Sequence, residues 1–147
     1  MTHRFIGAMI TAACLAIAPP LSAAPPETPR DSYTRALAQE RQGRDDATHP
    51  TLQQMRRVVA IYESLVRRHP ASSYCDNALW QGGNLAALAY QRFGDEADRK
   101  TAARLLAQLK TEYPSSKLVA KVPDALGALT ASAAPAATSG EAARAVR

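Results

Sequence analysis

The chain has 147 residues, of which 46% are hydrophobic, 5% aromatic and 21% charged, so it is long enough for one modest domain. Basic residues outnumber acidic ones by 18 to 13, and the net charge of +5 is too small and too scattered to indicate nucleic-acid binding. Two cysteines exclude a small disulfide-framework protein, and the length leaves little room for the large α/β enzyme families.

Residues 1–23 have the three sections of a secretory signal peptide. A charged start that includes Arg4 is followed by an apolar run from Phe5 to Ala18 and by a short segment that ends at Ala23. The apolar run spans 14 residues, whereas a bilayer-spanning helix needs roughly 20. We therefore expect cleavage after Ala23 and a periplasmic or secreted protein.

The two cysteines raise alternatives. Cys14 follows Thr11-Ala12-Ala13, which loosely resembles a lipobox, so lipidation at Cys14 would give an outer-membrane lipoprotein. Membrane contact is expected only through this lipidation or through an uncleaved signal. Cys75 stays in the mature chain, and we interpret it as a small buried residue. In a compartment that favours disulfides, an intermolecular bridge or a reactive thiol at Cys75 is the alternative.

Composition divides the mature chain into three parts. Residues 24–30 have the composition of a proline-rich linker, and residues 130–147 that of an alanine- and proline-rich disordered tail. Between them, in residues 31–129, hydrophobic residues recur at helical spacing and turn residues separate the segments. The sequence therefore predicts an all-α domain of about five helices, over 31–43, 51–68, 73–93, 96–112 and 116–129.

The helix predicted over 51–68 has one apolar face and one basic face. Thr51 and Gln54 form a capping box at its start, and Pro70 follows its end. Glu63 is placed to pair with Arg67 four residues further on. The basic stripe either engages an acidic partner or anionic lipid, or is only a solvated face. The apolar face holds Met55, Val58, Val59, Tyr62, Leu65 and Val66, and the basic stripe holds Arg56, Arg57, Arg67 and Arg68.

The helix predicted over 73–93 carries Gly82 and Gly83 at its centre, where each glycine costs about 1 kcal/mol relative to alanine. The pair indicates that another helix comes close, with a kink or a docking notch for a partner as the alternative. Trp80, Tyr90 and Phe93 on this helix fit core positions. Alternatively, Trp80 and Tyr90 line a binding groove together with Tyr62.

The helix predicted over 96–112 repeats the design of the one over 51–68. The two segments align at an offset of 44 residues, which places Pro114 on Pro70 and Tyr113 on His69. The apolar face of this helix holds Ala102, Leu105, Leu106, Leu109 and Tyr113.

This internal repeat resembles the closing half of a tetratricopeptide repeat, although a standard repeat is about 34 residues long. The phrases that end at Pro70 and Pro114 are similar to those of bacterial envelope proteins: the outer-membrane assembly lipoprotein, the Tol-Pal-associated coordinator and the N-terminal regions of some cell-wall amidases. The resemblance implies antiparallel helix pairs stacked as a short right-handed solenoid that binds proteins or peptides. The signature is carried by Val58, Tyr62, Leu65 and Pro70, and again by Ala102, Leu106, Leu109 and Pro114.

The mature chain carries no recognisable catalytic or ligand-binding motif. His49 and His69 stand in separate turns, each directly before a proline. The sequence has no paired cysteines, no His-Glu-x-x-His motif, no nucleophile elbow and no phosphate-binding loop. We therefore expect no enzyme activity, no cofactor and no metal.

Together these patterns predict an exported scaffold or adaptor at the bacterial cell envelope, with a protein or peptide as partner and no nucleic acid. One alternative is the N-terminal region of an N-acetylmuramoyl-L-alanine amidase, with the catalytic domain in a longer form, because the tail has the composition of a linker. A further alternative is an outer-membrane assembly or division lipoprotein anchored through Cys14.

Overall fold

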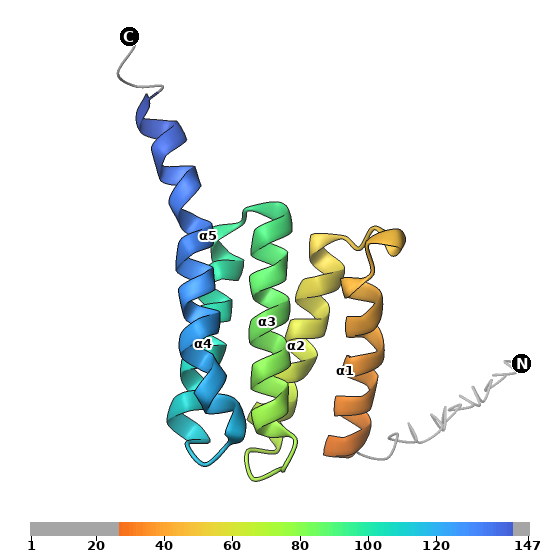
Figure 1. Cartoon of the computed structure of the whole chain (residues 1–147). Helices are drawn as coiled ribbons and strands as arrows, with labels where there is room; N and C mark the ends of the chain where they lie inside the picture. Colours follow the sequence, from red (N-terminus) through yellow and green to blue (C-terminus); the bar gives the residue numbers. More distant parts are fainter. Residues whose placement is uncertain (1–26, 143–147) are drawn as a thin grey trace, which may run out of the picture.

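The computed structural model describes the backbone of residues 27–142 and the side chains of residues 27–132. These described residues form helices and no strand, so the predicted all-α class is confirmed. No helix among them combines the length and mean hydropathy needed to cross a lipid bilayer. The α-helices are α1 (Pro29–Arg44), α2 (Leu52–Arg68), α3 (Cys75–Phe93), α4 (Glu96–Glu112) and α5 (Val122–Ala142), and the 3-10 helices are η1 (Asp46–Thr48) and η2 (Lys117–Lys121) (Figure 1).

Local sequence signals set the helix ends. The Gln54 N–H donates to Thr51 Oγ1 at 3.2 Å and the Thr51 N–H donates to Gln54 Oε1 at 2.7 Å, which confirms the predicted capping box of α2. Gly94 ends α3 with a φ of 72°, in the left-handed region that favours glycine. Asp95 then caps α4 by accepting a hydrogen bond from the Ala97 N–H at 2.9 Å.

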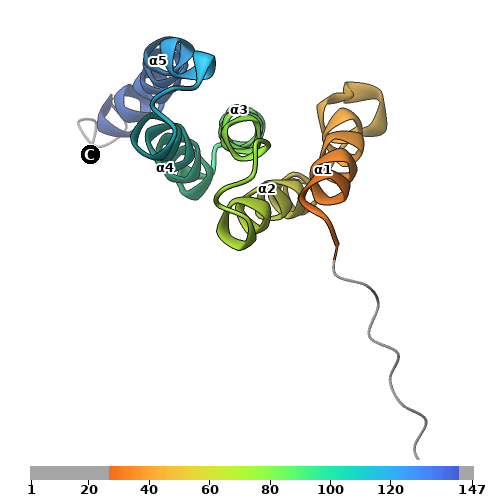
Figure 2. The ribbon, with the colours of Figure 1, turned by 90° about the horizontal axis from the view of Figure 1, so that it is seen from below.

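The helices form a row that follows the order of the chain, and each packs mainly against its neighbours in sequence (Figure 1). Seen end-on, α2 and α4 lie along one side of the row, and α1, α3 and α5 lie along the other (Figure 2). α3 is the central helix and packs on both α2 and α4. The signature residues Val58, Tyr62, Leu65, Ala102, Leu106 and Leu109 are all buried, whereas Pro70 and Pro114 are exposed in the turns.

The internal repeat extends to the turns that follow α2 and α4. In both turns the residue before the proline donates its N–H to the carbonyl four residues earlier. The second residue after the proline is a serine whose hydroxyl oxygen accepts from the backbone N–H of the residue two positions beyond that serine. The repeat is therefore one of structure as well as of sequence. The donor and acceptor pairs are His69 with Leu65 and Tyr74 with Ser72 in the first turn, and Tyr113 with Leu109 and Leu118 with Ser116 in the second.

The two glycines of α3 lie where its neighbours come closest. A Cβ atom on Gly83 would lie 2.9 Å from Leu106 Cγ, and one on Gly82 would lie 3.3 Å from both Tyr62 Cβ and Leu105 Cδ1. The glycines thus let α2 and α4 pack tightly on α3, as predicted. The alternative of a docking notch is wrong, because core side chains fill this space.

The ends of the helical region differ from the prediction. α1 begins at Pro29, inside the predicted linker 24–30, because Thr28 caps it by accepting from the Asp31 N–H at 3.2 Å. α5 continues to Ala142, into the predicted disordered tail 130–147. Alanine is the strongest helix former, so an alanine-rich segment readily prolongs a packed helix. The predicted signal peptide 1–23, with Cys14, lies outside the described residues, as do residues 143–147.

Candidate functional site

Tyr62 and Tyr90, two of the three aromatic residues predicted to line a groove, belong to the core. Their exposed fractions are 1% and 8%. The Tyr62 hydroxyl donates to the Glu40 carboxylate at 2.5 Å, and Glu40 is itself only 3% exposed. Burial and this hydrogen bond raise the pKa of Tyr62 above its usual value. The groove interpretation is wrong for both tyrosines, because neither offers a partner a usable surface.

Trp80 is half-buried on the face of α3 that α2 and α4 leave uncovered. This face lies on the side of the row where α1 and α5 flank α3 (Figure 2). The Lys121 ammonium lies 6.0 Å from the centroid of the Trp80 ring, within reach of a cation–π contact. We call this face the α3 stripe, and its half-buried and exposed residues are Asn77, Trp80, Gln81, Asn84, Ala87, Leu88 and Gln91.

Phe93 is the other aromatic residue of α3 for which the structure differs from the prediction. The sequence suggests a core position, but its side chain is 44% exposed. Phe93 is the last residue of α3, next to the Gly94 cap, and lines a shallow cleft with residues 49–52 at the start of α2.

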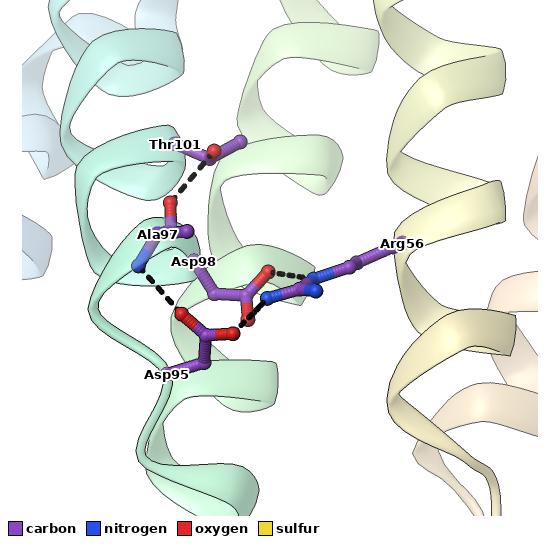
Figure 3. A network of polar contacts seen from close by, with 5 residues as sticks. All are labelled: Arg56, Asp95, Ala97, Asp98 and Thr101. Atoms are coloured by element: carbon purple, nitrogen blue, oxygen red, sulfur yellow. Dashed lines mark hydrogen bonds and ion pairs between the residues drawn. The ribbon is translucent and has the colours of Figure 1, made fainter.

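Arg56 of the predicted basic stripe is taken up by an internal ion-pair network, which we call the Arg56 brace (Figure 3). Its Nε and Nη2 atoms each donate to a carboxylate oxygen of Asp98 at 2.8 Å, and Nη2 also donates to Asp95 at 2.5 Å. Asp98 is only 4% exposed. The hydrogen bonds that Arg56 donates to Asp98 and Asp95 raise the pKa of Arg56. Asp95 accepts hydrogen bonds from the Ala97 N–H and from Arg56. These bonds, the first more than the second, hold the pKa of Asp95 below its usual value.

The Arg56 brace joins α2 directly to the start of α4, across the position of α3 in the row. Arg56 is therefore engaged by two aspartates although its side chain is 42% exposed, and its predicted role in a partner surface stays a prediction. The sequence signal for this role was the basic stripe alone, which does not reveal that two aspartates of α4 face it.

Arg67 of the predicted basic stripe lies apart from Arg56, in the cleft between α2 and α4. This cleft has a volume of about 400 Å³ and mixed charge. The predicted ion pair between Glu63 and Arg67 does not form. Glu63 pairs with Arg104 instead, because α4 brings the Arg104 guanidinium within reach. The cleft is lined by Glu63, Val66, Arg67, Pro70, Arg104, Gln108 and Glu112.

Arg57 and Arg68 lie on the other side of α2, where it meets α1. Two clefts of about 390 Å³ each occupy this junction; Arg57 lines both, and Arg68 lines one. Neither arginine forms an ion pair with any described residue. The predicted basic stripe is therefore three separate environments. Within the described residues Arg56 is ion-paired, whereas Arg67 in the α2–α4 cleft and Arg57 and Arg68 beside α1 form no ion pair.

The α1 side of these clefts was missed by the sequence analysis. Arg35 and Gln39 line the clefts from α1, and Glu40 supports Tyr62 from the same helix. α1 has no strong apolar stripe, because its buried residues are small or polar. The signal that could have identified its packed face is the helical spacing of Ser32, Ala36, Glu40 and Gly43.

The described side chains that could bind a metal or act as nucleophiles do not form a cluster. No group of three or more His, Cys, Asp or Glu side chains in the described part of the chain is placed to hold a metal ion. Cys75 is buried, and its Sγ donates to the His69 carbonyl oxygen at 3.0 Å, which fits the packing interpretation. His49 is exposed in the turn after η1.

Comparison with known proteins identifies no relative. No family model matches the chain, and no curated protein and no solved structure shows significant similarity to it.

Proposed function

We propose that this chain is an exported, non-catalytic helical-repeat module of the tetratricopeptide type that holds protein partners at the bacterial cell envelope. The α3 stripe is the observation that carries the proposal. The central helix of the row packs through one face on α2 and α4, and its opposite face is only partly covered by contacts with α1, α5 and η2. Stacked helix pairs commonly bind partners through such a surface.

The composition of the α3 stripe suits a protein partner. Trp80 and Leu88 supply apolar area, and tryptophan is among the residues most enriched at the energetic centres of interfaces. The four amide side chains of the stripe can donate to and accept from a peptide backbone. Apart from Lys121, which lies near the Trp80 ring, the surface is neutral in character.

Site-specific photo-cross-linking in a producing bacterium tests the surface. The cross-linker replaces Gln81 or Gln91 in the α3 stripe, and in matched controls it replaces Ala107 or Lys110 on α4, all exposed or half-buried. We expect discrete cross-linked species of the same added mass from both stripe positions and none from the controls. No species from the stripe, or equal yields from all four positions, would argue against the proposal.

The export part has its own test. Mass spectrometry of the mature protein from the periplasmic fraction is expected to give an unlipidated N-terminus at Ala24. A lipid-modified N-terminus at Cys14 would support the lipoprotein alternative, and an intact Met1 in the cytoplasmic fraction would contradict export.

A further inference from the structure

Arg57 and Arg68 point the same way along α2. They are eleven residues apart, which is three turns of an α-helix and a rise of about 16 Å. Ile61 and Ser64 lie between them on the same side of the helix. The two guanidinium groups therefore mark the two ends of one straight edge of α2.

This edge borders a continuous groove with α1, which we call the α1–α2 groove. The two clefts at this junction share Gln39 and Arg57 as lining residues, so they adjoin along the helices. Apolar groups form part of the lining, and amide side chains stand at one end. The apolar lining comes from Pro50, Val58, Ala60, Ile61 and Leu65, and the amides are Gln39, Gln42 and Gln54.

The charge of the α1–α2 groove is positive. Three arginines and one glutamate line it, and the glutamate is already engaged, because Arg35 pairs with Glu27 at 2.8 Å. Arg57 and Arg68 thus keep uncompensated charge beside an apolar surface, at least with respect to the described residues. A guanidinium in this setting gains most from a carboxylate, which it can bind through two hydrogen bonds.

We propose that the α1–α2 groove binds an acidic, extended segment of a partner protein. An extended chain advances about 3.3 Å per residue and its alternate side chains share one face, so two carboxylates four residues apart lie on one face about 13 Å apart, within reach of the long side chains of Arg57 and Arg68. The amides of Gln39, Gln42 and Gln54 meet the peptide groups of the segment, and Ala60 and Ile61 meet its apolar side chains. The length, the amides and the apolar lining favour a peptide over a lipid surface, which needs only protruding cations.

The α1–α2 groove and the α3 stripe are different surfaces. The residues that line the α1–α2 groove include none of the residues of the α3 stripe. Binding at the α1–α2 groove therefore does not depend on the proposed function of the α3 stripe, and substitutions in one surface leave the other intact.

Fluorescence anisotropy with labelled ten-residue peptides tests the proposal on the mature chain. The probe carries glutamate at positions 3 and 7 in a background of threonine, valine and alanine, and the control peptide carries glutamine at both positions. We expect the glutamate peptide to bind at least tenfold more tightly than the glutamine peptide at low salt, and this difference to shrink as salt screens the charges.

The protein variants locate the binding. Arg57→Gln with Arg68→Gln is expected to weaken binding of the glutamate peptide at least tenfold, whereas Arg57→Lys with Arg68→Lys keeps part of it because the charge remains. Lys100→Gln with Lys110→Gln removes the same charge from exposed positions of α4 and is expected to change the affinity less than twofold. All four positions are exposed or lie at the surface, and circular dichroism checks that each variant is folded.

Three results would overturn the proposal: equal affinity for the two peptides, equal loss in the α2 and α4 double variants, or no binding of the glutamate peptide at millimolar concentration. Co-sedimentation with phosphatidylglycerol vesicles is the competing measurement. If the chain sediments with these vesicles through Arg57 and Arg68 but does not bind the peptide, the groove faces an anionic membrane and the peptide proposal is wrong.

Discussion

Two adjacent glycines decide how closely three helices meet at the centre of this molecule. Gly83→Ala adds a methyl group at 2.9 Å from Leu106 Cγ, so the buried Leu106 side chain or the helix that carries it must shift. Overpacking of this kind costs about 1–3 kcal/mol, against a gain of about 1 kcal/mol in helix propensity. We expect Gly83→Ala to lower the free energy of unfolding by about 1 kcal/mol, measured by urea denaturation.

Gly127→Ala is the matched control. A Cβ atom on Gly127 of α5 meets no other atom within 4 Å, so only the helix propensity changes. We expect this variant to be more stable than the wild type by up to about 1 kcal/mol. If both alanine substitutions change stability in the same direction, the close contact with Leu106 is not what excludes a side chain at position 83.

The Tyr62–Glu40 hydrogen bond is a second residue-scale feature, and it makes stability depend on alkaline pH. Tyr62→Phe leaves the buried Glu40 without one donor, so we expect a loss of about 2 kcal/mol at pH 7. Burial raises the pKa of folded Tyr62 above the unfolded value of 10.0, so its contribution is complete below pH 10 and declines above it. The gap between wild type and Tyr62→Phe in urea denaturation is expected to narrow from pH 10 upward. A constant gap would contradict this linkage.

Single residues were predictable where the sequence limits the possible neighbours. The close approach at Gly82 and Gly83 could be inferred because two glycines inside a helix are costly without a packing reason. The burial of Glu40 could not, because its partner Tyr62 is 22 residues away and only the packing of α1 on α2 joins them. Tyr62 itself fits both a core and a groove position on its helical face, and only the packing distinguishes them.

At the scale of helices, the Arg56 brace is expected to couple α2 and α4. The double-mutant cycle of Arg56→Gln and Asp98→Asn isolates the interaction of the two side chains. We expect a larger coupling energy than for Arg104→Gln and Glu63→Gln, an ion pair that joins the same helices at more exposed positions. The reason is that Asp98 is buried and receives two hydrogen bonds from Arg56.

Salt provides the control for that comparison. The exposed Arg104–Glu63 pair is screened by solvent ions, so its coupling is expected to fall toward zero at high salt, while the Arg56–Asp98 coupling persists. Equal couplings at both salt concentrations would show that burial of Asp98 does not strengthen the brace.

The helices themselves were largely predictable, whereas their neighbours were not. Thr51, Gly94 and the prolines after α2 and α4 mark helix ends through local backbone chemistry, which a sequence displays directly. The basic stripe of α2 was correctly placed on the helix surface, but the helical angle does not say which helix borders each edge. α5 was predicted too short because small residues were interpreted as linker, although alanine favours helix.

At the scale of the whole molecule, stability is expected to vary along the row. α3 packs on both α2 and α4, whereas α1 is at one end and the last buried residue among the described side chains of α5 is Leu129. Native-state hydrogen exchange followed by NMR is therefore expected to be at least tenfold slower in α3 than in α1 or in residues 130–142. Uniform protection along the row would contradict this gradient.

A row of helices that touch only their immediate neighbours can lose its ends one helix at a time. The Arg56 brace adds a link between second neighbours, because it connects α2 to α4 past α3. Separating α4 from the helices before it then breaks contacts with both α3 and α2. We expect this to make unfolding more cooperative than in an array in which each helix contacts only its immediate neighbours. Two aspartates at the start of α4 thus tie this helix to α2 as well as to the neighbours on which it packs.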